Sequence, residues 1–182
     1  STLSSSSAAS DVYKRQLEHS AEAQRDLLEF RHTLEASCAY YAAQRATEPD
    51  RLRLKAAFDT LQDCYARADE VTRAEEGAAD ARFHLAIAEA SHNAVLLHTI
   101  RGLFDLLKRN VVTNIGGMYQ QRSETRDMLI SQHRELYLAI VEGRADEARE
   151  VSSRHILYVQ EVLEEAQDEA QRVARAERRS GR

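Results

Sequence analysis

Three histidines and one aspartate stand where predicted helices would otherwise carry apolar residues. Asp80 and His84 are four residues apart in AADARFHLAIAEASHN, so a helix places both side chains on one face. His133, in SQHRELYLAI, and His155, in SSRHILYV, each lie on an apolar stripe with helical spacing. Burying an unpaired carboxylate is costly, and one cation would explain all of these polar positions together. Asp80, His84, His133 and His155 are therefore predicted to bind a metal ion.

The predicted ion is a divalent metal of the Zn²⁺, Ni²⁺ or Mn²⁺ type, because imidazole and carboxylate groups do not select sharply among these ions. In octahedral geometry this ligand set leaves adjacent positions for water. A small acid that chelates through its carboxylate and an α-hydroxyl can displace that water. Metal-bound histidines must be neutral, so metal affinity is expected to fall as the pH drops.

Arg31 is a candidate for the residue that binds the effector. It lies on or beside the inner stripe of the first predicted helix, where a guanidinium can bind a ligand carboxylate through two parallel hydrogen bonds. An ion pair with Glu29, Glu35 or another acid of the bundle would explain Arg31 equally well. The residues alone leave both interpretations open.

Other interpretations of the polar residues also follow from the sequence. A lone histidine on an apolar face is more often a hydrogen-bonded core residue than a metal ligand. Glu29/His32 and Glu89/His92 have the spacing of di-iron bundles, but the first pair flanks an arginine and His92 falls in a turn.

We find no nucleophile with a histidine base and no phosphate loop, so an enzyme is not expected. A metalloenzyme that acts on a small acid and a purely structural helical module are the alternatives.

Helices must position these residues, because the whole composition favours helix. The chain of 182 residues contains one proline and six glycines, and Ala, Leu, Glu and Arg are its most prominent residues. The pattern predicts an all-α antiparallel bundle of about six helices with the metal site in its interior. The expected boundaries are a cap at Thr47 with Pro49 in the first turn, a break at residues 75–77, the turn at 91–93 with Asn93 as cap, Gly116–Gly117, and Gly143.

Apolar residues at helical spacing predict the buried face of each helix. The fourth helix is apolar over a broad face and is expected to be central. After the sixth stripe the sequence becomes strongly charged, and residues 171–182 are expected to form a solvated, frayed tail. In chain order, the predicted stripes are Leu27, Phe30 or Arg31, Leu34, Cys38 and Tyr41; Leu54, Phe58, Leu61 and Tyr65; Asp80, Phe83, His84 and Ile87; Val95, Leu96, Ile100, Leu103, Phe104, Leu107 and Val111; Leu129 or Ile130, His133, Leu136 or Tyr137, and Ile140; and Val151, His155, Val159 and Val162.

Charge and cysteine content exclude several classes of protein. The net charge of −5 gives no broad basic field for strong binding of nucleic acid. Cys38 and Cys64 form no CxxC motif and fit small buried residues in the reducing cytosol, so a cytoplasmic location is expected. No apolar run approaches the roughly 20 residues of a membrane span, and we expect no membrane partner.

Residues 1–16 are expected to be a non-native or disordered leader. STLSSSSAAS is of low complexity, and the following DVYKRQ matches the translation of a transposon end used to build sequencing libraries. The native chain is then expected to begin further upstream. Residues 17–170 are assigned to one domain.

Three segments together resemble the FadR-type C-terminal (FCD) domain of GntR-family bacterial transcription regulators. They are LLEFRHTLEASCAYYAAQRAT, DARFHLAIAEASHNAVLLHTIRGLFDLL and QHRELYLAIVEGRADEARE, and the likeness covers nearly all of residues 25–165. The lactate-responsive subgroup is the most similar, followed by pyruvate- and glycolate-responsive regulators. The D-x-x-x-H motif and two later histidines match the metal signature of the family at Asp80, His84, His133 and His155.

The resemblance implies a homodimeric domain that binds a small 2-hydroxy or 2-keto carboxylic acid at its metal. Arg31 matches an arginine that members of the family place in the effector pocket. These regulators also carry an N-terminal winged helix-turn-helix, which this sequence lacks. The chain is therefore expected to contact operator DNA only through that missing domain, and to sense an effector and dimerise by itself.

Overall fold

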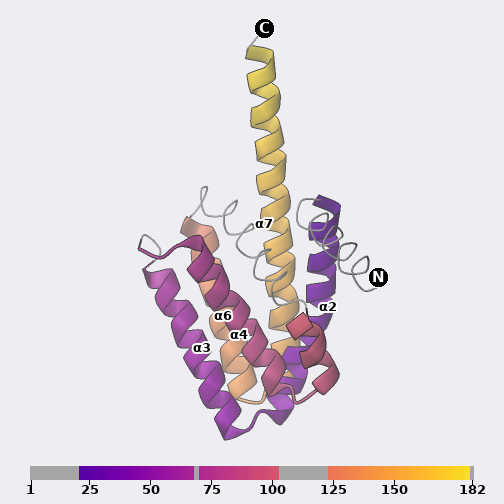
Figure 1. The fold of residues 1–182 in the computed structure, drawn as a ribbon, viewed down its shortest axis with the longest axis vertical. Helices are drawn as coiled ribbons and strands as arrows, with labels where there is room; N and C mark the ends of the chain where they lie inside the picture. Colours follow the sequence, from indigo (N-terminus) through magenta and orange to yellow (C-terminus); the bar gives the residue numbers. More distant parts are fainter. Residues whose placement is uncertain (1–20, 68–69, 103–122, 181–182) are drawn as a thin grey trace, which may run out of the picture.

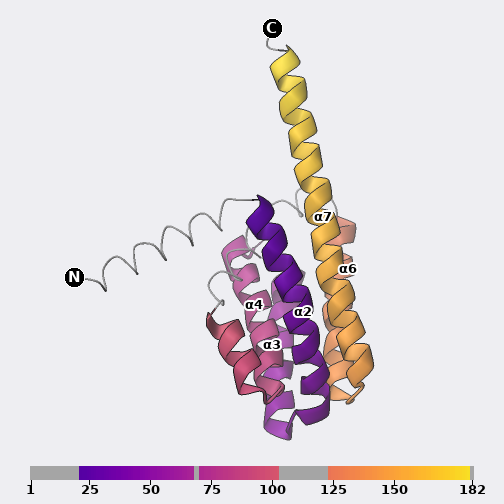
Figure 2. The same ribbon diagram turned by 90° about the vertical axis from the view of Figure 1, so that its right-hand side faces the viewer.

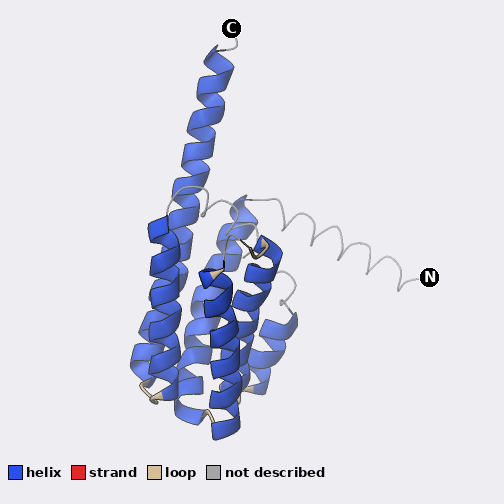
Figure 3. Cartoon of the chain, turned by 90° about the vertical axis from the view of Figure 1, so that its left-hand side faces the viewer, coloured by secondary structure: helices blue, strands red, loops and turns tan. Residues whose placement is uncertain are grey.

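The computed structural model describes residues 21–67, 70–102 and 123–180. The predicted leader at residues 1–16, the apolar positions 103–111 and the glycine pair 116–117 lie outside these residues. In the described part, all regular secondary structure is helical (Figure 3). No described helix combines the length and the apolar character that a membrane span requires.

The described helices form a bundle in which helices joined by short turns run antiparallel (Figure 1). Helix α2 packs against α7 and α4, α3 packs against α4 and α6, and α6 packs against α7. The C-terminal part of α7 extends beyond the other helices (Figure 2). The predicted all-α bundle is thus confirmed. In chain order the helices are α2 (Ala21–Arg45), α3 (Glu48–Ala66), α4 (Arg73–Ala90), an unlabelled helix at 94–102, α6 (Ser123–Val141) and α7 (Ala145–Ser180).

Side-chain caps fix where three of these helices begin. The Asp50 carboxylate accepts a hydrogen bond from the Thr47 backbone N–H at 2.9 Å, at the predicted start of α3. Asn93 Oδ1 accepts from the backbone N–H of residues 95 and 96 at 3.1 and 3.2 Å, as expected of a cap. Thr72 and Glu75 form a full capping box at the start of α4. The predicted break at residues 75–77 is therefore wrong, because α4 begins at Arg73 and passes through these positions.

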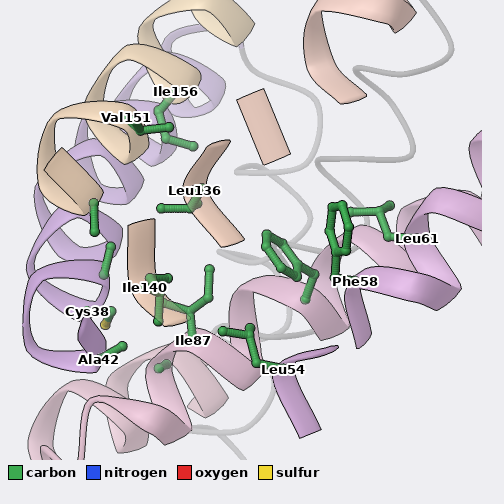
Figure 4. Close-up of a cluster of buried hydrophobic side chains, with 14 of the residues drawn as sticks. Cys38, Ala42, Leu54, Phe58, Leu61, Ile87, Leu136, Ile140, Val151 and Ile156 are labelled. Carbon is green, nitrogen blue, oxygen red and sulfur yellow. The ribbon is translucent and has the colours of Figure 1, made fainter. Parts of the chain in front are cut away.

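The core lies between the helices along most of the bundle. The predicted stripes of α3, α4, α6 and α7 provide its large buried side chains, among them Leu54, Phe58, Leu136 and Ile140 (Figure 4). Gly143 has a φ of 74°, a left-handed conformation that glycine adopts freely, and it stops α6 as predicted. This packing arranges the inner faces of α4, α6 and α7 around one shared core.

The buried face of α2 differs from the predicted stripe by a small rotation. Of the predicted stripe, Arg31 and Cys38 are buried, whereas Leu27, Leu34 and Tyr41 are only half-buried. The stripe that is buried overlaps the predicted one. That stripe is rich in alanine, which allows close helix packing, and its two charged residues form an ion pair. Its residues are Leu28, Arg31, Glu35, Cys38, Ala39 and Ala42.

Two further predictions about helix surfaces hold only in part. The helix at 94–102 was expected to be central, but Val95 is 74% exposed. Ile100 of the same helix is buried, as predicted. Residues 171–179 are exposed, but they are helical rather than frayed. Good helix-forming residues and an Arg172–Glu169 ion pair at 3.3 Å support this end of α7.

Candidate metal centre

Three helices bring three histidines to one point in the bundle. Helix α4 supplies His84, α6 supplies His133 and α7 supplies His155, and all three side chains are buried. One ring nitrogen from each lies within 4.8 Å of the others, so these atoms could hold a single metal ion. The ring centroids of His133 and His155 are 4.4 Å apart, and each lies 5.5 Å from that of His84.

Asp80 lies beside two of these rings. Its Oδ1 is 3.2 Å from Nε2 of His133, and its Oδ2 is 3.9 Å from Nε2 of His84. Burial raises the pKa of Asp80, but His84, His133 and Arg31 outweigh burial and hold this pKa well below its ordinary value. The carboxylate is therefore ionised and available to a cation. The structure thus places all four predicted ligands in one cluster, with the three imidazoles closest to a shared centre.

Contacts on the outer side of two rings determine which nitrogen carries the proton. His155 donates from Nδ1 to Oε1 of Gln132, a buried neighbour of His133, at 3.0 Å. Nδ1 of His84 lies 2.8 Å from Oε2 of Glu35. Acceptors at both Nδ1 atoms leave the Nε2 lone pairs for a metal ion, the arrangement that supporting residues give to metal-bound histidines.

Arg31 is buried next to the cluster and is already paired. Its Nε donates to Oε1 of Glu35 at 2.7 Å, so the ion pair considered from the sequence does form. Burial lowers the pKa of Arg31, but the Glu35 carboxylate more than compensates and raises it. Burial likewise raises the pKa of Glu35, but Arg31 and His84 together hold it well below its ordinary value. Both groups are charged at neutral pH.

The polar atoms that lack an aligned hydrogen bond test whether a metal ion would fit here. In the described part of the chain, such buried atoms include Nε2 of His84 and Nδ1 of His133. Nε2 of His133 and Oε2 of Glu35 also lack an aligned bond, although the first lies 3.2 Å from Asp80 and the second 2.8 Å from Nδ1 of His84. Buried polar atoms without partners are unfavourable, and native structures rarely leave several in one place. A divalent ion would bind one unpaired nitrogen from each of these two rings. The donor set therefore fits a metal.

The charges of the buried groups are also compatible with a bound cation. Arg31 contributes +1, and Glu35 and Asp80 contribute −1 each, so these residues sum to −1 when the histidines are neutral. Burial lowers the pKa of His133 and of His155, which keeps both rings neutral. Burial also lowers the pKa of His84, but Glu35 and Asp80 reverse this and raise it. One positive charge balances the cluster, and either a second proton on His84 or a metal ion can supply it.

The residue pairs with di-iron spacing do not converge on this centre. Glu29 is exposed and His32 is only half-buried. Glu89 pairs with Arg101 at 2.7 Å, and Nε2 of His92 lies 2.6 Å from Asp50 at the start of α3. The structure therefore does not support the di-iron interpretation.

Glu35 and Gln132 are the site residues that sequence reasoning missed. Glu35 entered only as one possible partner of Arg31, and its contact with His84 needs the pairing of α2 with α4. Gln132 contacts His155 from the neighbouring helix α6. A local signal existed for Glu35, because it lies one turn after Arg31 on the same face.

Comparison with protein families finds one match over most of the chain. The FCD domain model matches residues 26–158. The "Putative L-lactate dehydrogenase operon regulatory protein" of Escherichia coli K12 is 39% identical over 157 residues, which cover 86% of this chain and 57% of that protein. The Glc operon transcriptional activator of the same organism is 28% identical over 151 residues, which cover 83% of this chain and 59% of the relative. The chain thus spans somewhat more than half the length of these relatives.

Solved structures share the fold. Streptococcus agalactiae GntR aligns with a TM-score of 0.60 at 22% identity, covering 76% of this chain and 58% of that one. Escherichia coli McbR/YncC aligns with a TM-score of 0.63 at 18% identity, covering 80% of this chain and 66% of that one. At these identities the likeness concerns the arrangement of helices.

Proposed function

This chain belongs to the FCD domain family of GntR-type regulators, and we propose that it is the effector-sensing and dimerisation domain of a bacterial metabolite-responsive transcription regulator. We assign residues 17–170 to this domain and residues 171–182 to a charged tail, which is helical as far as Ser180. The relatives named above are operon regulators, which favours a regulator over an enzyme. Operator DNA would be bound in the cytoplasm by a separate N-terminal domain of the full-length protein.

The proposed cofactor is a divalent metal ion of the Zn²⁺, Ni²⁺ or Mn²⁺ type. Asp80, His84, His133 and His155 would hold it, and it would supply a positive centre with coordination positions open to a ligand. One observation carries this proposal: three buried imidazoles from three helices have ring nitrogens within 4.8 Å of one another. The unpaired nitrogens of His84 and His133 support it.

The proposed effector is a small 2-hydroxy or 2-keto monocarboxylic acid, such as lactate. The charges of Arg31, Glu35 and Asp80 sum to −1, and a divalent ion changes the sum to +1. A monocarboxylate would make the buried cluster neutral, whereas a neutral ligand would not. Arg31 uses Nε toward Glu35, so the N–H groups of its two terminal nitrogens can bind the acid. The name of the lactate operon relative agrees with this class of ligand.

Effector binding would act on the arrangement of the helices. The cluster joins α2, α4, α6 and α7, so a ligand that contacts both Arg31 and the metal favours one packing of these helices. In a dimer, that packing sets the relative position of two DNA-binding domains. The shift in this equilibrium equals the difference in the affinity of the ligand for the two arrangements.

Metal content and ligand-induced stabilisation test this proposal. We expect about one divalent ion per chain after purification without chelators, and a rise in Tm of roughly 5 to 10 °C with the matching acid at about a hundred times its Kd. L-lactate, pyruvate and glycolate are compared with and without added Zn²⁺. H133A and H155A should lose both the metal and the stabilisation, because each removes a ligand from the ion.

H98A is the matched control, since His98 is exposed on the helix at 94–102. It should retain the metal and the ligand response of the wild-type chain. The site assignment fails if H133A and H155A still bind metal and acid as the wild type does. Steady consumption of the acid by metal-loaded protein would support the metalloenzyme instead.

A further inference from the structure

The carboxylate of Glu35 lies between two residues of the proposed site. Its Oε2 is 2.8 Å from Nδ1 of His84, and its Oε1 accepts a hydrogen bond from Nε of Arg31 at 2.7 Å. The side chain is buried, with an exposed fraction of 4%. This buried carboxylate can therefore influence both the proposed metal ligand and the proposed effector-binding residue that it contacts.

We propose that Glu35 is a positioning residue for the metal and effector site: it orients His84 with Nε2 toward the metal, and the same carboxylate holds Arg31. This inference rests on the proposed function, since it assumes that a metal binds His84. It assigns to α2 a direct influence on metal affinity, although α2 supplies none of the proposed metal ligands.

The geometry around His84 explains why Glu35 should affect metal binding. An imidazole presents one nitrogen to a metal only if the other carries the proton, and a carboxylate beside Nδ1 favours the proton there. It also increases the basicity of the ring, which strengthens the bond from Nε2 to a cation. Gln132 supports His155 in the same way, but as a neutral amide it provides orientation without charge. Glu35 should therefore influence metal affinity more strongly than Gln132.

Sharing one carboxylate also connects Arg31 to the metal site. If Glu35 is removed, His84 and Arg31 lose the same partner, so metal and effector affinity should both decrease. If Arg31 is removed, Glu35 still contacts His84, so metal affinity should be largely kept. The two single variants are expected to differ, which a general loss of packing would not predict.

Zn²⁺ affinity, measured by competition with a chromophoric chelator, separates these cases. We expect E35Q to weaken Zn²⁺ binding about 10- to 100-fold, the range typical for the loss of a supporting residue. R31Q should stay within about threefold of the wild type, because His84 keeps its carboxylate. E29Q, an exposed glutamate of the same helix, is the matched control and should not change the affinity.

Glu35 is buried, so E35Q leaves the Arg31 charge without its partner and could unfold the chain. The double variant R31Q/E35Q removes both charges and should fold, as checked by circular dichroism. It should show the same Zn²⁺ defect as E35Q. Wild-type affinity in folded E35Q or in the folded double variant would overturn the inference.

A spectroscopic measurement on the wild-type chain needs no folded variant. In the Zn²⁺-loaded protein, ¹⁵N spectra of the histidine side chains should show His84 with a proton on Nδ1 and with Nε2 shifted by the metal. A proton on Nε2, or a metal-bound Nδ1, would overturn the inference. A wild-type chain that binds no Zn²⁺ would contradict the proposed function itself, whereas a chain that binds Zn²⁺ without needing Glu35 would contradict only this inference.

Discussion

The histidines of the candidate metal centre have different electrostatic surroundings although all are buried. His155 faces the neutral amide of Gln132, and burial lowers its pKa well below the ordinary value. Burial also lowers the pKa of His84, but Glu35 and Asp80 outweigh burial and raise it. His155 is therefore neutral and ready to bind a metal, whereas the two carboxylates favour a second proton on His84, which the metal must displace.

Metal affinity should therefore depend on pH mainly through His84. Its raised pKa means that protons compete with the metal up to pH values above 6.5, the ordinary value for histidine. We expect Zn²⁺ affinity to rise from pH 6 to pH 8, with release of up to about one proton per bound ion. Calorimetric titration in buffers of different ionisation enthalpy measures the proton release. Equal affinity at both ends of this range would contradict the prediction.

At the scale of the helix, α4 carries two of the proposed ligands, and its capping box fixes where it starts. Thr72 and Glu75 satisfy each other's backbone N–H groups at 3.3 and 2.8 Å. The cap lies two turns before Asp80, and the helix continues through His84 to Ala90. The local sequence at the start of α4 thus helps to order the helix that presents the carboxylate and one imidazole.

Removing this cap should destabilise the metal-free chain. We expect T72A to lower the free energy of unfolding by about 1 kcal/mol, because the first turn of α4 loses a hydrogen-bond acceptor for its backbone. Urea denaturation measures the change. T60A is the control: Thr60 lies inside α3, is exposed, and donates only to the carbonyl of Ala56. The capping argument fails if T72A is no less stable than T60A.

At the scale of the whole molecule, two parts of α7 lie in different environments. His155 is buried in the bundle, whereas residues 171–179 of the same helix are exposed and project beyond the other helices (Figure 1). Just before this segment, a hydrogen bond between Gln167 and Gln24 at 3.3 Å joins α7 to α2. Further along, the Arg172–Glu169 ion pair and the hydrogen bonds from Arg175 and Arg178 to backbone carbonyls of Gln171 and Ala174 lie within α7.

Deleting residues 171–182 should therefore change the isolated bundle very little. We expect the free energy of unfolding to stay within about 0.5 kcal/mol of the full chain, the range for changes at exposed surface. Zn²⁺ affinity should also be unchanged. Urea denaturation and chelator competition test both values. A larger loss of stability that depends on protein concentration would show that this part of α7 packs against a second chain.

Much of the fold follows from local sequence. Helical spacing predicted the buried residues of α3, α4 and α7, because one apolar stripe dominates each of these helices. The caps at Thr47 and Asn93 were predicted from the same local chemistry. The box at Thr72 was missed, although threonine followed three residues later by glutamate is visible in the sequence.

For the site, the sequence determined that Asp80 and His84 share a face, because four residues make about one helical turn. It also indicated that His133 and His155 point inward, since apolar residues flank them at helical spacing. Only the tertiary structure decided that three imidazoles meet within 4.8 Å, and that α2 turns Glu35 toward His84. Two overlapping stripes compete on α2, and packing against α7 and α4 selects the one that adds Glu35 to Arg31. The rotation of α2 about its own axis depends on contacts between residues distant in sequence, which a local pattern does not contain.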